Sequence, residues 1–181
     1  MLGWILESQV KIVNDHRDAL KKSMEAGSIT GLLVMLWAPI MCFPQWFGGL
    51  ALGLLGSKPA LAVFGARMAA MCIVRKLDEH IPYTRALGLC HLVTFSPVLL
   101  WLAYREPRAT SSMDAYCEAF LSFQKLVISL CLFLDARDLL LHGLGHPFPC
   151  YIREAVQGGL IVIKDPRAQR PVTLPARLIG P

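Results

Sequence analysis

Residues 26–57 form a run of 32 positions without a single Asp, Glu, Lys or Arg. About 20 consecutive apolar residues are enough for one helix to cross the hydrocarbon core of a bilayer. A soluble domain rarely contains so long an uncharged stretch, because its surface needs charge to stay in solution. The run therefore predicts a membrane-spanning helix, and Ser28 is placed to act as its N-cap.

The middle of this run contains residues that interrupt regular helices. Pro39 and Pro44 each lack a backbone donor, and the Gly48-Gly49 pair loosens the helix. Two interpretations stay open: one long kinked helix, or a span followed by a re-entrant turn. Gly49 and Gly53 also have the G-x-x-x-G spacing that lets helix backbones approach closely, although this spacing is common by chance.

The overall composition also indicates a membrane protein. Hydrophobic residues make up 55% of the 181-residue chain and charged residues 17%, against about 45–50% and about 25% in soluble domains. The mean hydropathy is +0.49. The net charge of +5 does not indicate a nucleic-acid partner, because the basic residues neither form a long run nor alternate with aromatics. We expect an all-α, polytopic integral membrane protein.

Four segments are apolar enough to be expected as transmembrane helices: residues 29–56, 59–74, 86–104 and 116–135. Together they define a membrane region over residues 28–141. The second segment carries Arg67 near its centre. Along it, Ala62, Ala66 and Ala70 place small side chains on one stripe, which favours close packing against another helix.

The third and fourth segments differ in how cleanly they avoid charge. The third has no formal charge apart from a possible one on His91, and it ends in an aromatic pair typical of the bilayer interface. Glu118 and Lys125 interrupt the fourth. A charged cluster that begins at Asp135 follows the fourth segment, and the helix is able to continue through it as far as residue 141.

The two ends of the chain are more polar than its centre. Residues 1–27 are predicted to form an amphipathic helix, whose apolar face either lies in the bilayer interface or packs on protein. Residues 142–181 are predicted to be a small soluble tail, with a β-like run at 160–163. With four spans both termini share a side, and that side holds most of the 18 Lys and Arg residues. The positive-inside rule then puts both termini in the cytoplasm.

Arg67 and Lys125 are the sharpest features of the predicted spans. Each lies near mid-depth, where a cation costs at least about 2.5–3.5 kcal/mol. No carboxylate of this chain is expected at the same depth, and Glu118 is two turns from Lys125 towards the opposite surface. Three interpretations stay open: snorkelling and backbone hydrogen bonds, an acidic partner on another subunit, or a water-lined path that attracts anions.

Cofactor and metal sites are not predicted. His91 is the one histidine well inside a clean segment, and haem ligation would need a second deep histidine, so a core histidine bonded to a neighbour is expected. His142, His146 and Cys150 have four-residue spacings, but the glycines and prolines among them argue against a metal-binding helix. The six cysteines include no C-x-x-C pair and are interpreted as small buried hydrophobes.

Catalytic motifs are absent from the sequence: there is no G-x-S-x-G elbow, Walker loop, H-E-x-x-H or dinucleotide fingerprint. We therefore expect a non-enzymatic protein that binds other membrane proteins or itself, such as a small accessory subunit of a secretion, conjugation or respiratory complex. The alternatives are an inner-membrane protective protein (toxin immunity or entry exclusion) and a small transporter or channel. A helical core enclosed in a large soluble assembly also stays open.

Overall fold

The computed structural model describes residues 14, 17–25, 27–78, 80, 84–105 and 111–157. These residues are 88% helical and include no strand, which confirms the all-α prediction for them. The predicted β-like run at 160–163 and most of the predicted amphipathic helix lie outside the described residues.

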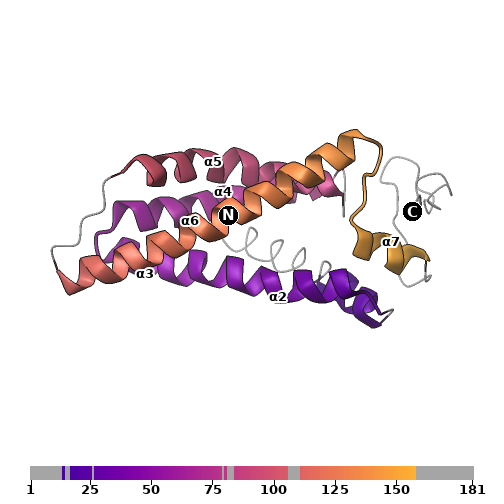
Figure 1. Ribbon diagram of the computed structural model, residues 1–181, viewed down its shortest axis with the longest axis horizontal. Coiled ribbons are helices and arrows are strands. Elements are labelled where there is room, and N and C mark those ends of the chain that lie inside the picture. The colour runs from indigo at the N-terminus through magenta and orange to yellow at the C-terminus, as the bar shows by residue number, and fades with distance from the viewer. Residues whose placement is uncertain are drawn as a thin grey trace. The chain divides into compact units, whose positions relative to one another are not determined.

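The helices follow one another with short connections (Figure 1). Residues 17–25 are helical, and the labelled elements are α2 (Ile29–Phe43), η1 (Pro44–Gly48), α3 (Gly49–Leu54), α4 (Lys58–Asp78), η2 (Arg85–Gly88), α5 (Leu89–Tyr104), α6 (Ser112–Gly143) and α7 (Cys150–Gln157).

The long uncharged run is one continuous helix of 26 residues, Ile29–Leu54, and not a span followed by a re-entrant turn. The element η1 is a single stretch of π-helix at its centre, and Pro44 is the first residue of η1. The N–H of Gly49 donates to the carbonyl of Pro44, five residues back. The wider π-helical turn thus accommodates the proline without breaking the helix.

Local side-chain chemistry sets the helix starts. Gly27 has φ +84°, a conformation that ends the helix over residues 17–25 at low cost. Ser28 Oγ then accepts the N–H of Gly31 at 3.1 Å and caps α2, as the sequence predicted. Ser57 caps α4 in the same way, since its Oγ accepts the N–H of Ala60 at 3.3 Å.

Three helices are long and apolar enough to cross a membrane: Ile29–Leu54, Arg85–Tyr104 and Ser112–Gly143. They match three of the four predicted spans. The remaining one, α4, has 21 residues, but Lys58, Arg67, Arg75 and Lys76 lower its apolarity. Helix α6 has 32 residues and extends beyond the predicted 116–135 at both ends.

The chain divides into two compact units, of which the first comprises residues 1–37, 74–87 and 138–181. In this unit the side chains of Ala19 and Ile152 are buried together, and Phe148 and Tyr151 pack around them. The helix over residues 17–25 therefore packs on α7, and α7 itself is a helix where the sequence predicted none.

Arg85 connects the two later parts of the first unit. Its guanidinium forms an ion pair with Asp138 on α6 and donates through Nε to the carbonyl of Phe148 at 3.2 Å. The backbone N–H of Arg85 donates to the carbonyl of Pro147 at 2.8 Å. These contacts hold the segment before α7 against η2.

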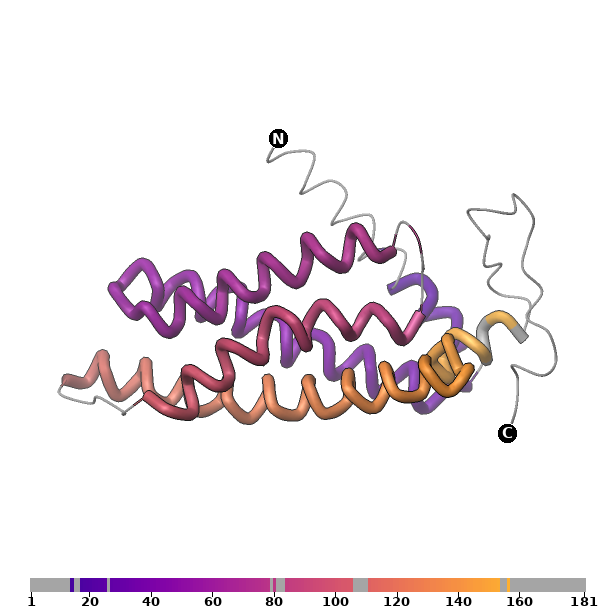
Figure 2. The backbone as a smooth tube through the Cα atoms, turned by 90° about the horizontal axis from the view of Figure 1, so that it is seen from above, coloured from indigo at the N-terminus to yellow at the C-terminus, as the bar shows by residue number. Residues whose placement is uncertain are grey.

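The second unit comprises residues 38–73 and 88–137, and close helix packing fixes it. Figure 2 shows α3 turning back into α4. An ideal Cβ on Gly49 would lie 3.1 Å from Phe64 Cβ, and one on Gly53 would lie 3.1 Å from Leu61 Cβ. The G-x-x-x-G spacing thus brings α3 against α4 within this chain. On α4, Ala66 and Ala70 are buried whereas Ala62 is half-buried.

Candidate functional site

The inner face of α6 carries polar residues among apolar ones. Leu121, Gln124, Ile128 and Cys131 are buried, and Asp135 continues the same row one turn further. Residues three and four apart share one face of a helix. The row therefore brings a thiol and a carboxylate together inside the second unit.

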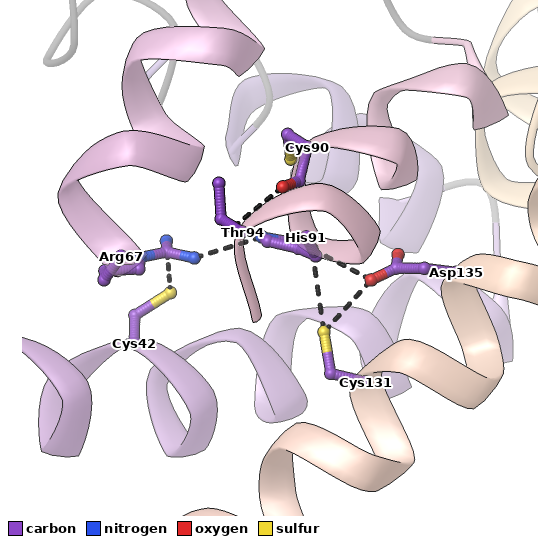
Figure 3. A network of polar contacts seen from close by, with 7 residues as sticks. All are labelled: Cys42, Arg67, Cys90, His91, Thr94, Cys131 and Asp135. Atoms are coloured by element: carbon purple, nitrogen blue, oxygen red, sulfur yellow. Dashed lines mark hydrogen bonds and ion pairs between the residues drawn. The ribbon is translucent and has the colours of Figure 1, made fainter. Parts of the chain in front are cut away.

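His91 on α5 meets both of these groups (Figure 3). Its Nδ1 lies 2.9 Å from Asp135 Oδ2 and 3.6 Å from Cys131 Sγ. Cys131 Sγ in turn lies 3.1 Å from Asp135 Oδ2. A nitrogen, a sulfur and an oxygen therefore lie within 4.8 Å of one another.

Arg67 on α4 approaches His91 from the other side of the ring. Arg67 Nη1 lies 3.3 Å from His91 Nε2, and Arg67 Nη2 donates to Cys42 Sγ at 2.8 Å. The Arg67 side chain is buried. Three helices of the second unit, α4, α5 and α6, thus supply one polar chain, and α2 supplies Cys42.

The direction of hydrogen bonding in this chain follows from the arginine. A guanidinium has donors and no acceptor, so His91 Nε2 must accept its N–H. The ring proton then lies on Nδ1 and donates to Asp135. A neutral imidazole therefore connects a cation with an anion, and the formal charges of Arg67 and Asp135 cancel inside the unit.

This arrangement differs from the relay of a thiol hydrolase. In such a relay the nucleophile and the orienting carboxylate or amide contact opposite nitrogens of the histidine. Here Cys131 and Asp135 both approach Nδ1, and Arg67 occupies Nε2. Asp135 cannot orient the ring towards Cys131, so the geometry does not favour nucleophilic catalysis.

The Asp135 side chain lies in the space that a side chain at position 88 would fill, and Gly88 has no side chain. An ideal Cβ on Gly88 would lie 2.8 Å from Asp135 Oδ1 and 3.0 Å from Asp135 Cβ. Gly88 is one helical turn before His91, so the missing side chain lets α5 and α6 approach at the level of the site. Close packing requires glycine at position 88, whereas its backbone conformation, with φ −60°, is open to any residue.

Further polar atoms are buried in the same unit. Gln45 Oε1, both polar atoms of the Gln124 side chain and Arg67 Nε have no hydrogen-bond partner among the described residues. Buried polar groups in proteins are nearly always hydrogen-bonded. The interior of this unit is therefore more polar than its apolar composition alone would indicate.

Glu118 and Lys125 do not belong to this chain of contacts. Glu118 forms an ion pair with Arg105, the residue that follows α5. Lys125 is half-buried on α6, and no hydrogen bond or ion pair joins it to another residue in the part of the chain that the structure describes. The two predicted intramembrane cations thus differ: Arg67 has an internal counter-charge, and Lys125 has none among the described residues.

The sequence reasoning found no carboxylate of this chain to balance Arg67, and the structure provides one through His91. Asp135 was predicted at the very end of the fourth span, but α6 continues to Gly143, so Asp135 lies inside the helix. It reaches Arg67 through His91. The hydrogen bonds of Arg67 go to side chains and not to backbone carbonyls as the first interpretation expected.

Sequence reasoning missed three members of the site: Cys42, Cys131 and Asp135. The cysteines were interpreted as small buried hydrophobes, and Asp135 as the start of a charged cluster after the fourth span. The available signal was the four-residue spacing of Cys131 and Asp135, which puts both on one helix face, together with one histidine in the preceding segment. His142, His146 and Cys150 form no such ligand group in the described residues.

Comparison with known proteins gives no relative for this chain: no family model, no curated protein and no solved structure matches it.

Proposed function

We propose that this chain is an integral membrane protein that crosses the bilayer four times, with both termini in the cytoplasm. It works without catalysis by binding other membrane proteins, as a small accessory subunit of a larger complex of the secretion, conjugation or respiratory type. Three observations support this proposal. The three apolar helices and the two ion pairs support the crossings, and one lysine that is unpaired among the described residues supports the partner.

The ion pairs between helical segments support a membrane-crossing hairpin of α5 and α6. Glu118 and Asp138 are 20 residues apart on α6, which corresponds to about 30 Å of helix. Their partners Arg105 and Arg85 are also 20 residues apart. The hydrocarbon core of a bilayer is about 30 Å thick, so one pair would stand at each headgroup region.

The polar chain supports α4 as the fourth crossing. With 21 residues, α4 is about 32 Å long, enough to cross the hydrocarbon core. A buried Arg67 would be costly alone, but Asp135 compensates its charge through His91. Four crossings place both termini on one side, which the positive-inside rule makes the cytoplasm.

Lys125 is the observation that carries the proposal of a partner. It lies seven residues from Glu118, about 10 Å along α6, which is about a third of the interval between the two ion pairs. A lysine inside the hydrocarbon core without a counter-charge costs up to about 2.5–3.5 kcal/mol, the value at the centre of a spanning helix. An Asp or Glu on a helix of another subunit, at the same depth, would remove this cost. A partner carboxylate is therefore the simplest source of the missing charge.

The test compares Lys125→Met with Lys58→Met in the full chain. Lys58 is exposed at the first residue of α4 and gives a matched loss of charge. After extraction of native membranes in mild detergent, we expect the wild type and Lys58→Met to migrate as one complex larger than the 20.0 kDa chain. Lys125→Met should migrate as the isolated chain.

The decisive step is a charge exchange with the partner that is identified in that complex. Lys125→Glu should lose the complex, and replacing the matching partner carboxylate by lysine should restore it. A complex that survives Lys125→Met unchanged would refute the role of Lys125. A wild type that purifies alone would refute the accessory-subunit function.

A further inference from the structure

We propose that His91, Cys131 and Asp135 form a metal-binding site for Zn²⁺ within the second unit. Imidazole nitrogen, thiolate sulfur and carboxylate oxygen are the three ligand types that proteins use for zinc. This site is independent of the partner proposed for Lys125, since none of its residues is Lys125 or Glu118.

The distances between the ligand atoms fit a tetrahedral metal. Bond lengths of about 2.3 Å to sulfur and about 2.0–2.2 Å to nitrogen and oxygen give ligand-to-ligand distances of about 3.4–3.6 Å. The separation of His91 Nδ1 and Cys131 Sγ is already 3.6 Å. Asp135 Oδ2 lies 2.9 Å from the nitrogen and 3.1 Å from the sulfur. A shift of Asp135 Oδ2 by about half an ångström completes the triangle.

The backbone holds these ligands together before a metal binds. Cys131 and Asp135 are four residues apart on one face of α6, and His91 faces them from α5. Gly88 leaves the room in which the Asp135 carboxylate lies and turns. Three protein ligands leave a fourth position for water, the arrangement of zinc sites that keep an open position.

Arg67 acts as the competing cation of this site. While it donates to His91 Nε2, the ring proton lies on Nδ1, and that nitrogen has no lone pair for a metal. When Zn²⁺ binds, the ring proton moves from Nδ1 to Nε2, Arg67 leaves Nε2, and the Cys131 thiol releases one proton to water. Binding of one Zn²⁺ therefore releases one proton and adds one net positive charge to the site.

The exchange has a consequence for affinity. Two positive charges in one buried site repel each other strongly because the surroundings screen them weakly. Replacing Arg67 by the uncharged Met, which has a similar length, should tighten Zn²⁺ binding by about tenfold or more. A role of Arg67 in packing alone would not predict tighter metal binding.

The experiment uses the full chain in detergent micelles and Co²⁺ as a spectroscopic probe for Zn²⁺. The wild type should bind one Co²⁺ with an absorption band from thiolate-to-metal charge transfer, and Zn²⁺ should displace it. Cys131→Ser should lose this band and weaken Zn²⁺ binding by at least about a hundredfold, since loss of an outer partner alone costs about 10–100-fold. The matched control is Cys90→Ser, a buried thiol beside His91 that should keep the band.

A measurement on the intact ligand set guards against misfolding of Cys131→Ser. X-ray absorption of Zn²⁺-loaded Cys90→Ser protein should show one sulfur at about 2.3 Å and nitrogen or oxygen ligands at about 2.0–2.2 Å. A first shell without sulfur, or a wild type that binds no Co²⁺, would overturn the proposal. So would a charge-transfer band that persists in a folded Cys131→Ser protein.

Discussion

At the scale of single residues, Asp135 decides how the second unit tolerates a buried arginine. Its Oδ2 accepts from His91 Nδ1 at 2.9 Å, and its charge balances that of Arg67 at the other end of the imidazole. Removing one member of a buried charge pair leaves the other uncompensated, which is costlier than removing both.

The double-mutant cycle of Arg67→Met and Asp135→Asn tests this coupling. Each single variant should lower the free energy of unfolding in detergent by about 3 kcal/mol, because it leaves one buried charge unbalanced. The double variant should lose less than the sum of the two, with a coupling energy of about 0.5–3 kcal/mol. Strictly additive losses would show that the two charges act independently.

The same residues show what sequence reasoning could not predict. The presence of a buried cation at Arg67 was evident from the sequence alone. Its compensation was not, since His91 is 24 positions from Arg67 and Asp135 is 44 positions from His91. Such contacts depend on the register between helices, which no local pattern encodes.

At the scale of helices, the sequence predicted the starts better than the ends. The hydroxyl of Ser28 and the Lys58-Pro59 step are local signals, and α2 and α4 begin where these signals indicate. The end of α6 was harder, because the charged cluster from Asp135 onward ended the predicted span at residue 135 and left open a helix that continues to residue 141. Asp135 and Asp138 instead bind His91 and Arg85, so tertiary contacts keep these charges inside the helix.

A pair of glycine substitutions tests the packing of α5 on α6. Gly88→Ala should destabilise the protein by about 1–3 kcal/mol, because the new Cβ would lie 2.8 Å from Asp135 Oδ1. Gly65→Ala on α4 is the control, since nothing lies within 4 Å of its Cβ position. It should stabilise the helix by about 0.5–1 kcal/mol. The measurement is the thermal unfolding midpoint in one detergent, and equal effects of the two variants would contradict the close approach.

At the scale of the whole molecule, the proposed membrane topology depends on whether three or four helices cross the bilayer. The three apolar helices alone would leave the termini on opposite sides, whereas a crossing by α4 brings them to the same side. Composition alone could not decide whether α4 crosses, because its four basic residues make it less apolar than the three candidate spans.

Fusions of alkaline phosphatase, which is active outside the cytoplasm, test the topology. With four crossings, fusions after residues 56 and 111 should be active and fusions after residues 80 and 157 inactive. If α4 does not cross, the fusions after 56 and 80 should agree with each other, and the fusion after 111 should be inactive. Fluorescent-protein fusions at the same four positions should give the opposite pattern and serve as the control.

If α5 and α6 cross the bilayer as proposed, the equal interval between the two ion pairs would also make this hairpin selective for its lipid. In a bilayer much thicker than about 30 Å, either Arg85 and Asp138 or Arg105 and Glu118 would have to enter the acyl chains or the bilayer would have to thin around them. Each ångström of such mismatch costs a fraction of a kcal/mol. Hydrophobic mismatch would therefore sort this protein towards membranes of ordinary thickness and away from sterol-rich or long-chain lipid domains.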